Sequence, residues 1–131
     1  MPLTDPTAFA HAWLESWNAH DIDGVLAHFS DDARFTSPVA RQLLDGSDGV
    51  LRGKAAIRSY WEEGLRHIPD LHFEIVDIYA GLDVLVINYR NQRGGLVNEV
   101  LIFDGDLVGE GHGTYRDSSA NLAGATVESG R

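Results

Sequence analysis

Apolar residues recur at every third or fourth position in three segments of the first half of the chain, which predicts three helices. The first begins at Asp5, a capping residue that is followed by proline at the first helical position. The second helix is predicted within residues 21–29 and the third over 53–68, where the periodic pattern ends at a proline. Between these two helices, residues 33–37 alternate like a short strand.

From residue 71 onward the hydrophobic period changes to two, which is the period of a β-strand. Strands are predicted over 71–79, 83–90, 96–103 and 107–115, and glycine occurs in each turn between them. Helices, one strand, a further helix and then an antiparallel meander are typical of the α+β class. We therefore expect an α+β fold with three N-terminal helices packed on a mainly antiparallel sheet.

The remaining segments complete a single predicted domain over residues 1–116. Residues 38–52 form a long, glycine-containing loop with several aliphatic side chains, and a loop of this length is a candidate lid over a site. Residues 117–131 are small and polar without a sustained period, so we expect a flexible C-terminal tail.

Composition excludes several kinds of function. The net charge of −10 argues against a nucleic-acid partner, because an acidic chain repels phosphate backbones. The chain contains no cysteine, which rules out disulfides, thiolate zinc sites and thiol nucleophiles. The first residues show no signal-peptide pattern and no segment approaches the length of a membrane helix. We therefore expect a cytoplasmic protein with no membrane partner.

Both faces of the predicted central hairpin are apolar, which is unusual for a sheet covered by helices on one side only. Val84 and Val86 alternate with Leu85 and Ile87, so apolar side chains point in both directions. Three helices cover only one of these faces. A second copy of the chain is the expected cover for the other face, and a homodimer through the outer sheet face is predicted.

The last strand, in GEGHGTYR (109–116), alternates glycine with ionisable or polar residues. If Asp104 and Gly105 form a two-residue hairpin turn, Glu99 lies opposite Glu110 and diagonal to His112 on one face of the sheet. A three-residue loop would shift the register by one position and turn the glycines to that face instead. The two-residue register is the one we expect.

Two facing carboxyl groups in an apolar pocket do not both remain ionised at low cost. One of them then holds a proton with a raised pKa, or the nearby histidine takes a positive charge and pairs with it. Either arrangement places an acid and a base in one pocket, as proton-transfer chemistry requires. Two acids and one histidine are also a conceivable divalent-metal site, but the expectation is no metal and no cofactor.

Three segments resemble the nuclear transport factor 2-like superfamily: WNAHDIDGVLAHFSDDARF, LRGKAAIRSYWEEGL followed by PDLHFEI, and the closing hairpin around NEVLIFDGDLV. They are most similar to its SnoaL-like branch, which also holds ketosteroid isomerases, polyketide cyclases, scytalone dehydratases and limonene-epoxide hydrolases. The resemblance covers about residues 7–116. It implies a cone-shaped fold in which a strongly curved sheet and its helices enclose a largely apolar pocket, but this fold carries many different activities.

The resemblance also implies which residues look into the pocket. The aspartate base of the ketosteroid isomerases corresponds to Ser37, their tyrosine donor to Trp13, and their second acid to Glu99. Only Glu99 keeps the chemical type, so a true ketosteroid isomerase is not expected. The same alignment turns Glu110 and His112 inward.

The candidate site follows from these arguments. The acid–base residues are Glu99, Glu110 and His112, and the ligand is expected to be a small apolar molecule that bears oxygen. The function predicted is a small-molecule-binding protein that acts as a cofactor-independent isomerase, cyclase, dehydratase or hydrolase, and the alternative is a non-catalytic binding or dimerisation module. The expected ligand-binding residues are Trp13, Trp17, Ser37, Tyr60, Val86, Asn88, Val97, Leu101 and Thr114.

Overall fold

A computed structural model describes residues 5–117. The predicted tail at 117–131 therefore lies, apart from its first residue, outside the described residues. The elements in chain order are α1 (Pro6–Asn18), α2 (Ile22–Leu26), β1 (Phe29–Thr36), α3 (Pro38–Leu43), β2 (Val50–Arg52), α4 (Lys54–His67), β3 (Glu74–Gly81), β4 (Val84–Arg90), β5 (Leu96–Asp104) and β6 (Leu107–Tyr115). None of the helices in this part of the chain is long and apolar enough to span a membrane.

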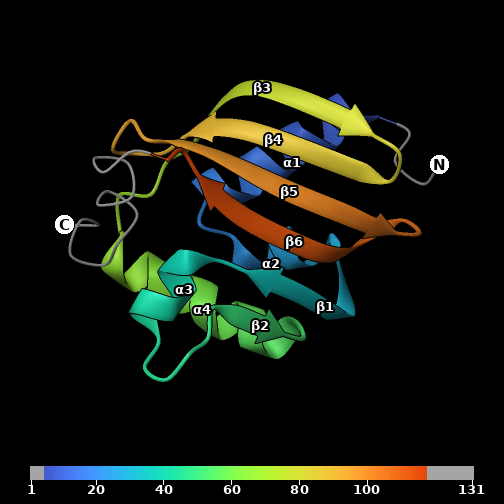
Figure 1. Ribbon diagram of the computed structural model, residues 1–131. Helices are drawn as coiled ribbons and strands as arrows, with labels where there is room; N and C mark the ends of the chain where they lie inside the picture. Colours follow the sequence, from blue (N-terminus) through green and yellow to red (C-terminus); the bar gives the residue numbers. More distant parts are fainter. Residues whose placement is uncertain (1–4, 118–131) are drawn as a thin grey trace.

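The six strands form one curved sheet in the order β2-β1-β6-β5-β4-β3. Neighbouring strands are antiparallel except β1 and β6, which run parallel, so the sheet is mixed. Helix α1 lies behind β4 and β5, and the opposite face of these strands is turned toward the viewer with no described element in front of it (Figure 1). The α+β fold and the three predicted helices are confirmed, and α3 is a fourth.

Local side-chain caps explain where the first two helices begin. The carboxylate of Asp5 accepts a hydrogen bond from the Ala8 amide at 3.0 Å, and Pro6 occupies the first helical position. Asp21 caps α2 in the same way through the Gly24 amide at 3.0 Å. Both starts were therefore predictable from the residue types alone.

The segment 38–52 is not the continuous loop that we predicted. Ser37 caps α3 by accepting a hydrogen bond from the Val39 amide at 3.1 Å, and Pro38 begins the helix. After residues 44–49, strand β2 pairs with the end of β1. The same cap-and-proline signal that marks α1 is thus present at Ser37–Pro38, and this segment supplies part of the wall of the pocket described below.

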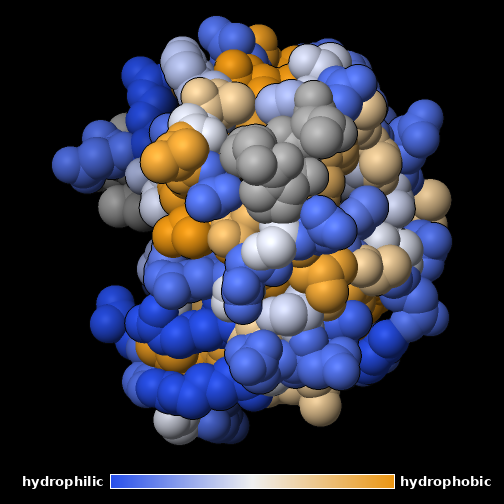
Figure 2. Space-filling model, turned by 90° about the vertical axis from the view of Figure 1, so that its right-hand side faces the viewer, coloured by the Kyte–Doolittle hydropathy of each residue, from blue (hydrophilic) through white to orange (hydrophobic). Residues whose placement is uncertain are grey.

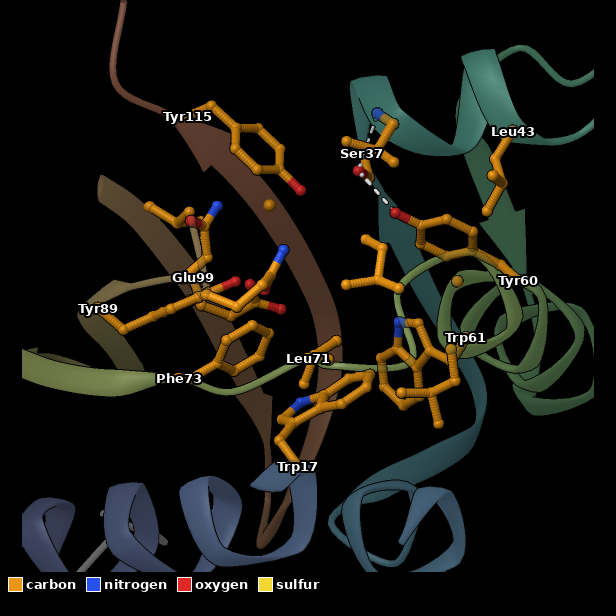
Figure 3. A pocket seen from close by; sticks show the side chains of 18 of the residues that line it. Trp17, Ser37, Leu43, Tyr60, Trp61, Leu71, Phe73, Tyr89, Glu99 and Tyr115 are labelled. Atoms are coloured by element: carbon orange, nitrogen blue, oxygen red, sulfur yellow. Dashed lines mark hydrogen bonds between the residues drawn. The ribbon is translucent and has the colours of Figure 1, made fainter. Parts of the chain in front are cut away.

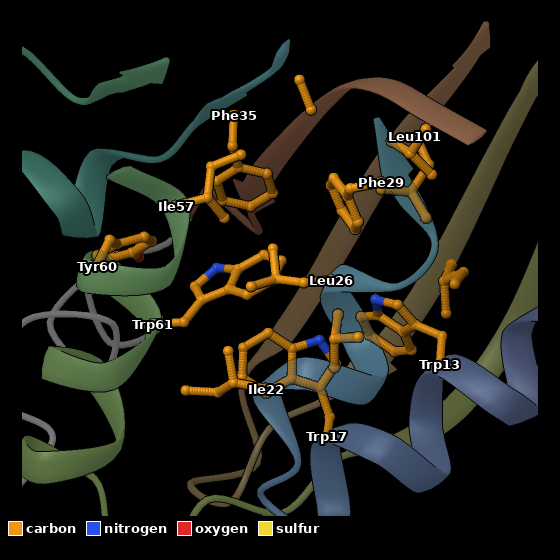
Figure 4. Packing of buried hydrophobic residues seen from close by; sticks show 14 of the residues in the cluster. Trp13, Trp17, Ile22, Leu26, Phe29, Phe35, Ile57, Tyr60, Trp61 and Leu101 are labelled. Atoms are coloured by element: carbon orange, nitrogen blue, oxygen red, sulfur yellow. The ribbon is translucent and has the colours of Figure 1, made fainter. Parts of the chain in front are cut away.

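The core is built mainly from aromatic rings that α1, β1 and α4 contribute (Figure 4). Trp61 of α4 is the central ring, because it makes edge contacts with Trp17 at 4.9 Å, Phe29 at 5.4 Å and Phe35 at 5.6 Å between ring centroids. Trp13 is fully buried beside them. These rings hold the helices against the concave face of the sheet.

The hairpin between β5 and β6 turns one residue later than predicted. Asp104 pairs with Leu107, so the two-residue loop consists of Gly105 and Asp106. This change alone shifts the β6 partner of each β5 residue by two positions from the predicted one. Because a strand alternates with a period of two, each side chain of β6 would still lie on the predicted face.

A β-bulge directly after this turn reverses the faces of β6. Phe103 pairs with Val108, but Ile102 pairs with Glu110, so Gly109 is an extra residue without a partner. One unpaired residue changes the alternation of all positions that follow it. The prediction that the glycines of β6 lie on the outer side was therefore wrong, because residues 111 and 113 face the helices.

The outer position of five predicted site residues follows from this register. Glu99 pairs with Gly113 and with Ile87, so the inward residues of β4 are the odd-numbered ones. Residues that were expected to look into the pocket therefore lie on the outer face of the sheet. They are Val86, Asn88, Glu110, His112 and Thr114.

The register predicts unequal costs for adding one methyl group at the two inward glycines. In Gly111→Ala, the new Cβ lies 2.9 Å from Phe35 and 3.3 Å from Leu101, and overpacking should destabilise the fold by about 1–3 kcal/mol. In Gly113→Ala, the nearest atoms lie at 3.8 Å, so the free energy of unfolding should change by less than about 0.5 kcal/mol. Urea unfolding of both variants measures the difference, and equal small effects would contradict the inward placement.

Candidate functional site

A pocket opens between the concave face of the sheet and the helices α1, α3 and α4. Its cavity volume is about 100 Å³, of the same order as an engineered cavity of about 150 Å³ that holds benzene. The walls are mainly aromatic, and the rings of Trp17, Phe73 and Trp61 surround its inner part (Figure 3). The other aromatic side chains in the lining are Trp13, Phe35, Tyr60, Tyr89 and Tyr115.

Glu99 is the acidic group inside this pocket. It extends from β5 toward the cavity beside Phe73 and Tyr89 (Figure 3), and only 5% of its surface is exposed. Burial raises the pKa of its carboxyl group to about 8, and no neighbouring charge offsets this effect. No hydrogen bond holds the carboxyl group to any other residue within 5–117. At neutral pH Glu99 is therefore a protonated acid that can donate a hydrogen bond into the cavity.

Three hydroxyl groups lie across the cavity from Glu99, and we call Ser37, Tyr60 and Tyr115 the hydroxyl cluster. Ser37 Oγ accepts a hydrogen bond from the Tyr60 hydroxyl at 3.1 Å, in addition to the amide that it caps. The Tyr115 hydroxyl points toward Ser37 (Figure 3). Burial raises the pKa of both tyrosines, so the whole cluster is uncharged at neutral pH.

Polar side chains occur again at the rim of the pocket, where His67, Asn91 and Gln92 line it. His67 is the C-terminal residue of α4, and its Nε2 lies 3.0 Å from the carboxylate of Glu63 one turn earlier. These rim residues are half-buried or exposed, whereas the carboxyl group of Glu99 is buried inside the pocket.

The structure brings half of the predicted site residues to the pocket. Six of them line it: Trp13, Trp17, Ser37, Tyr60, Val97 and Glu99. Leu101 faces inward as expected but is fully buried in the core and does not reach the cavity. The five outer-face residues named above do not reach it either, so the expected contact between Glu99 and Glu110 across one face is wrong.

Glu110 and His112 form a separate polar chain on the outer face. His112 Nε2 lies 2.6 Å from Glu110, its Nδ1 lies 2.6 Å from the Thr36 hydroxyl, and Glu110 pairs with Arg34 at 3.1 Å. The four side chains lie side by side on the parallel strands β1 and β6. Each member thus has a partner of complementary hydrogen-bonding type, as in a structural link between two strands.

The two remaining polar residues of the outer face, Asn88 and Thr114, also have hydrogen-bond partners. The amide of Asn88 donates a hydrogen bond to the side chain of Asn98 at 2.8 Å, and the Thr114 hydroxyl donates to the Asn98 carbonyl at 2.8 Å. Among residues 5–117, no group of three or more histidine, aspartate or glutamate side chains is arranged to hold a metal ion.

Sequence reasoning missed several pocket residues, chiefly Phe73, Tyr89, Gly113 and Tyr115. The sequence contains only a conditional signal for the last two. Val108 and Tyr115 are separated by an odd number of positions, so both can face inward only if the strand contains a bulge.

A curved mixed sheet with helices over its concave face and a pocket between them is the α+β architecture that the resemblance to the nuclear transport factor 2-like superfamily implied. Comparison with protein families finds a match to the SnoaL-like domain over residues 10–117. The chain belongs to the SnoaL-like family. A comparison with curated proteins found no match.

Solved structures with the same fold agree with this assignment. A SnoaL-like protein of unknown function from Burkholderia thailandensis is 39% identical, with a TM-score of 0.81 over 88% of this chain and 99% of that chain. AclR, a putative hydroxylase from Streptomyces galilaeus, is 22% identical, with a TM-score of 0.67 over 90% and 92%. IdmH, a putative polyketide cyclase from Streptomyces antibioticus, is 15% identical, with a TM-score of 0.73 over 91% and 96%.

The raised pKa of Glu99 predicts how the stability of the protein depends on pH. The unfolded chain loses this proton near pH 4.5 and the folded protein near pH 8, so the wild type should lose stability between these values, up to about 5 kcal/mol. Glu99→Gln removes this titration and should become progressively more stable relative to the wild type as the pH rises from 5 to 8.5. Urea unfolding across this range measures the trend.

The matched control is Glu15→Gln, which makes the same chemical change at an exposed position of α1. Its stability relative to the wild type should not change in this way with pH. A flat difference between Glu99→Gln and the wild type would show that Glu99 is ionised in the folded protein at neutral pH.

Proposed function

We propose that this protein binds a small, apolar, oxygen-bearing molecule in its pocket and uses Glu99 as the proton donor to an oxygen of that molecule. The observation that carries the proposal is the buried, unpaired carboxyl group of Glu99 among aromatic walls. Apolar pockets with a few convergent polar groups are the usual sites for small molecules. A proton donor whose pKa lies near the working pH is suited to general acid catalysis.

The chemistry that fits this site needs no charge on the ligand. Glu99 transfers its proton to a carbonyl or hydroxyl oxygen, and the ligand returns a proton from carbon to water or to the carboxylate. This exchange is shared by isomerisation, cyclisation and dehydration of oxygenated carbon skeletons. The fold neighbours IdmH, a putative polyketide cyclase, and AclR, a putative hydroxylase, support a role on such skeletons at the level of the family.

Proton exchange at the carbon next to a ketone tests this proposal without knowledge of the natural ligand. Acetophenone is a neutral ring-sized ketone, and its methyl protons exchange with D2O through the enol. The wild type should bind it and accelerate the exchange. In Glu99→Gln the exchange rate should be at least tenfold lower than in the wild type, because the variant lacks the proton donor. One-dimensional proton NMR measures the exchange rate, and shifts of the protein amide signals measure binding.

The exposed-site variant Glu15→Gln serves as the control and should exchange acetophenone at the wild-type rate. Binding without acceleration would favour the alternative function, a non-catalytic binding module. Absence of binding by acetophenone would contradict the proposed ligand class.

A second proposal concerns the partner of the outer sheet face. Half-buried valines in the middle of this face, among them Val84, Val86 and Val100, form an apolar strip. By contrast, the end of the molecule that carries the hairpin turns shows apolar residues scattered among hydrophilic ones (Figure 2). We infer that a second copy covers the strip and that the protein is a homodimer.

Charge supports a second copy as the partner. Asp77 is exposed on β3 at one edge of the outer face. Arg34 and Arg52, which pair within the chain with Glu110 and Asp48, are exposed at the opposite edge. Two copies related by a two-fold axis along the strands place each acidic edge over the basic edge of the partner.

Val100→Lys places a charge at the centre of the strip and should convert a dimer into a monomer of 14.4 kDa. Leu82→Lys is the control, because this side chain is 89% exposed in the turn before β4. Sedimentation equilibrium measures the mass of each variant. A wild type that remains monomeric at high micromolar concentration would exclude the proposed dimer.

A further inference from the structure

The rim of the pocket carries polar side chains that proton donation by Glu99 does not use. His67 comes from the end of α4, and Asn91 and Gln92 come from the turn between β4 and β5. They line the same cavity as Glu99, whose carboxyl group is buried inside it. A ligand that fills the cavity and meets Glu99 at one end can therefore meet the rim with its other end.

His67 is paired with an acidic residue one turn earlier in α4. Glu63 Oε2 lies 3.0 Å from His67 Nε2, and Glu63 Oε1 accepts a hydrogen bond from Arg66 Nε at 3.1 Å. The hydrogen bond from Arg66 holds the pKa of the Glu63 carboxyl group below its ordinary value. Glu63 is therefore an ionised carboxylate at neutral pH, and it can only accept hydrogen bonds.

This pairing decides which ring nitrogen of His67 carries the hydrogen. Because the carboxylate of Glu63 only accepts, Nε2 is the donor in the contact between them. In a neutral imidazole the other nitrogen, Nδ1, is then an acceptor with a free lone pair. No residue within 5–117 forms a hydrogen bond with Nδ1 of His67.

The two other polar residues of the rim are less suited to accept a hydrogen bond from a ligand. The Oδ1 atom of Asn91 already accepts hydrogen bonds from the amides of Arg93 at 3.0 Å and Gly95 at 2.9 Å. The amide of Gln92 has no partner among the described residues that would hold it in one orientation. Among these three residues, His67 combines a free acceptor with a neighbour that orients it.

We propose that His67 Nδ1 binds a hydroxyl group at the outer end of the ligand and that Glu63 is the positioning residue that keeps the hydrogen on Nε2. This inference rests on the proposed function and specifies the substrate class. The ligand is a ring compound with a phenolic or alcoholic hydroxyl group at the end opposite to the oxygen that Glu99 protonates. A methyl group or a ketone at that end has no hydrogen to donate to Nδ1.

Paired derivatives of acetophenone test this rim site: the meta- and para-hydroxy compounds and the methyl compounds of the same shape. The preference for a hydroxy probe is its affinity relative to that of its methyl analogue. For at least one of the two positions, this preference should be about fivefold larger in the wild type than in His67→Gln, as one net hydrogen bond provides. Titrations followed by protein NMR measure the dissociation constants.

The choice of substitution separates the two ring nitrogens. The amide of glutamine reaches the place of Nε2, so His67→Gln keeps a donor for Glu63 and lacks the acceptor at Nδ1. The amide of asparagine reaches the place of Nδ1, so His67→Asn should recover part of the preference for the hydroxy probe.

The ring nitrogens of His67 give a signature that a purely structural role would not change. Two-bond ¹H–¹⁵N correlation spectra distinguish a nitrogen that carries hydrogen from one with a lone pair, and His67→Gln identifies the signals by their loss. In the free wild type at neutral pH the hydrogen should lie on Nε2. The hydroxy probe should shift the Nδ1 signal upfield, and the methyl probe should leave it unchanged.

Glu63→Gln tests the positioning role, because an amide can donate as well as accept and no longer restricts the hydrogen to Nε2. The nitrogen signals of His67 should move toward a mixture of both tautomers, and the preference for the hydroxy probe should fall. Glu62→Gln is the matched control, since it makes the same change in the same helix at a side chain that pairs with Arg58 at 3.8 Å. Its nitrogen signals and its preference should remain those of the wild type.

The outcomes separate the two proposals. If neither acetophenone nor any of its derivatives binds the wild type, the proposed function fails and the rim site fails with it. If the probes bind but His67→Gln keeps the preference, the rim site is overturned while the proposed function stands. Hydrogen on Nδ1 of the free protein, or an Nδ1 signal that the hydroxy probes do not move, would overturn the rim site in the same way.

Discussion

One unpaired residue, Gly109, decides which side chains of the last strand face the pocket. Without the bulge, Glu110 and His112 would look into the cavity beside Glu99, and the site would contain two acids and an imidazole. With it, glycines occupy the inward positions opposite β5, and Tyr115 reaches the pocket from the end of the strand. The chemistry of the pocket therefore depends on a backbone irregularity rather than on the order of the ionisable residues.

The solitary position of Glu99 is the main consequence of this arrangement. A buried carboxyl group without a cation or a second acid stays protonated, because its ionised form loses solvation and gains no partner. Had Glu110 and His112 faced it, the pair would have shared a proton and the histidine could have carried the charge. The bulge thus changes the pocket from an acid–base pair into a neutral set of hydrogen-bond donors.

The elements of this fold were predictable because they rest on local signals, such as the helix caps at Asp5 and Asp21 and the change of hydrophobic period at residue 71. The pocket residues of the helices followed from the same periodicity and from the family resemblance. The register of β6 was not predictable from its turn alone, because two neighbouring two-residue turns are both compatible with the residues around Gly105. Leu107 and Val108 are both apolar, so the spacing to Tyr115 fits a regular strand if Leu107 faces inward and a bulged strand if Val108 does. The pairing in the structure shows that Val108 faces inward.

The polar residues on the outer face of the sheet and those in the pocket differ in a way that bears on function. On the outer face, His112 has a partner at each ring nitrogen, and Glu110 contacts a histidine and an arginine. The hydrogen-bonding groups of these side chains are therefore satisfied without a ligand. In the pocket, no residue within 5–117 forms a hydrogen bond with the Glu99 carboxyl group, and the buried indole nitrogens of Trp13 and Trp17 have no partner there either. Buried polar groups without partners are costly to a fold, and their persistence is explained when a ligand or ordered water supplies what is missing. The residues with unmet hydrogen-bonding capacity, rather than the most reactive residue types, therefore identify the functional site of this protein.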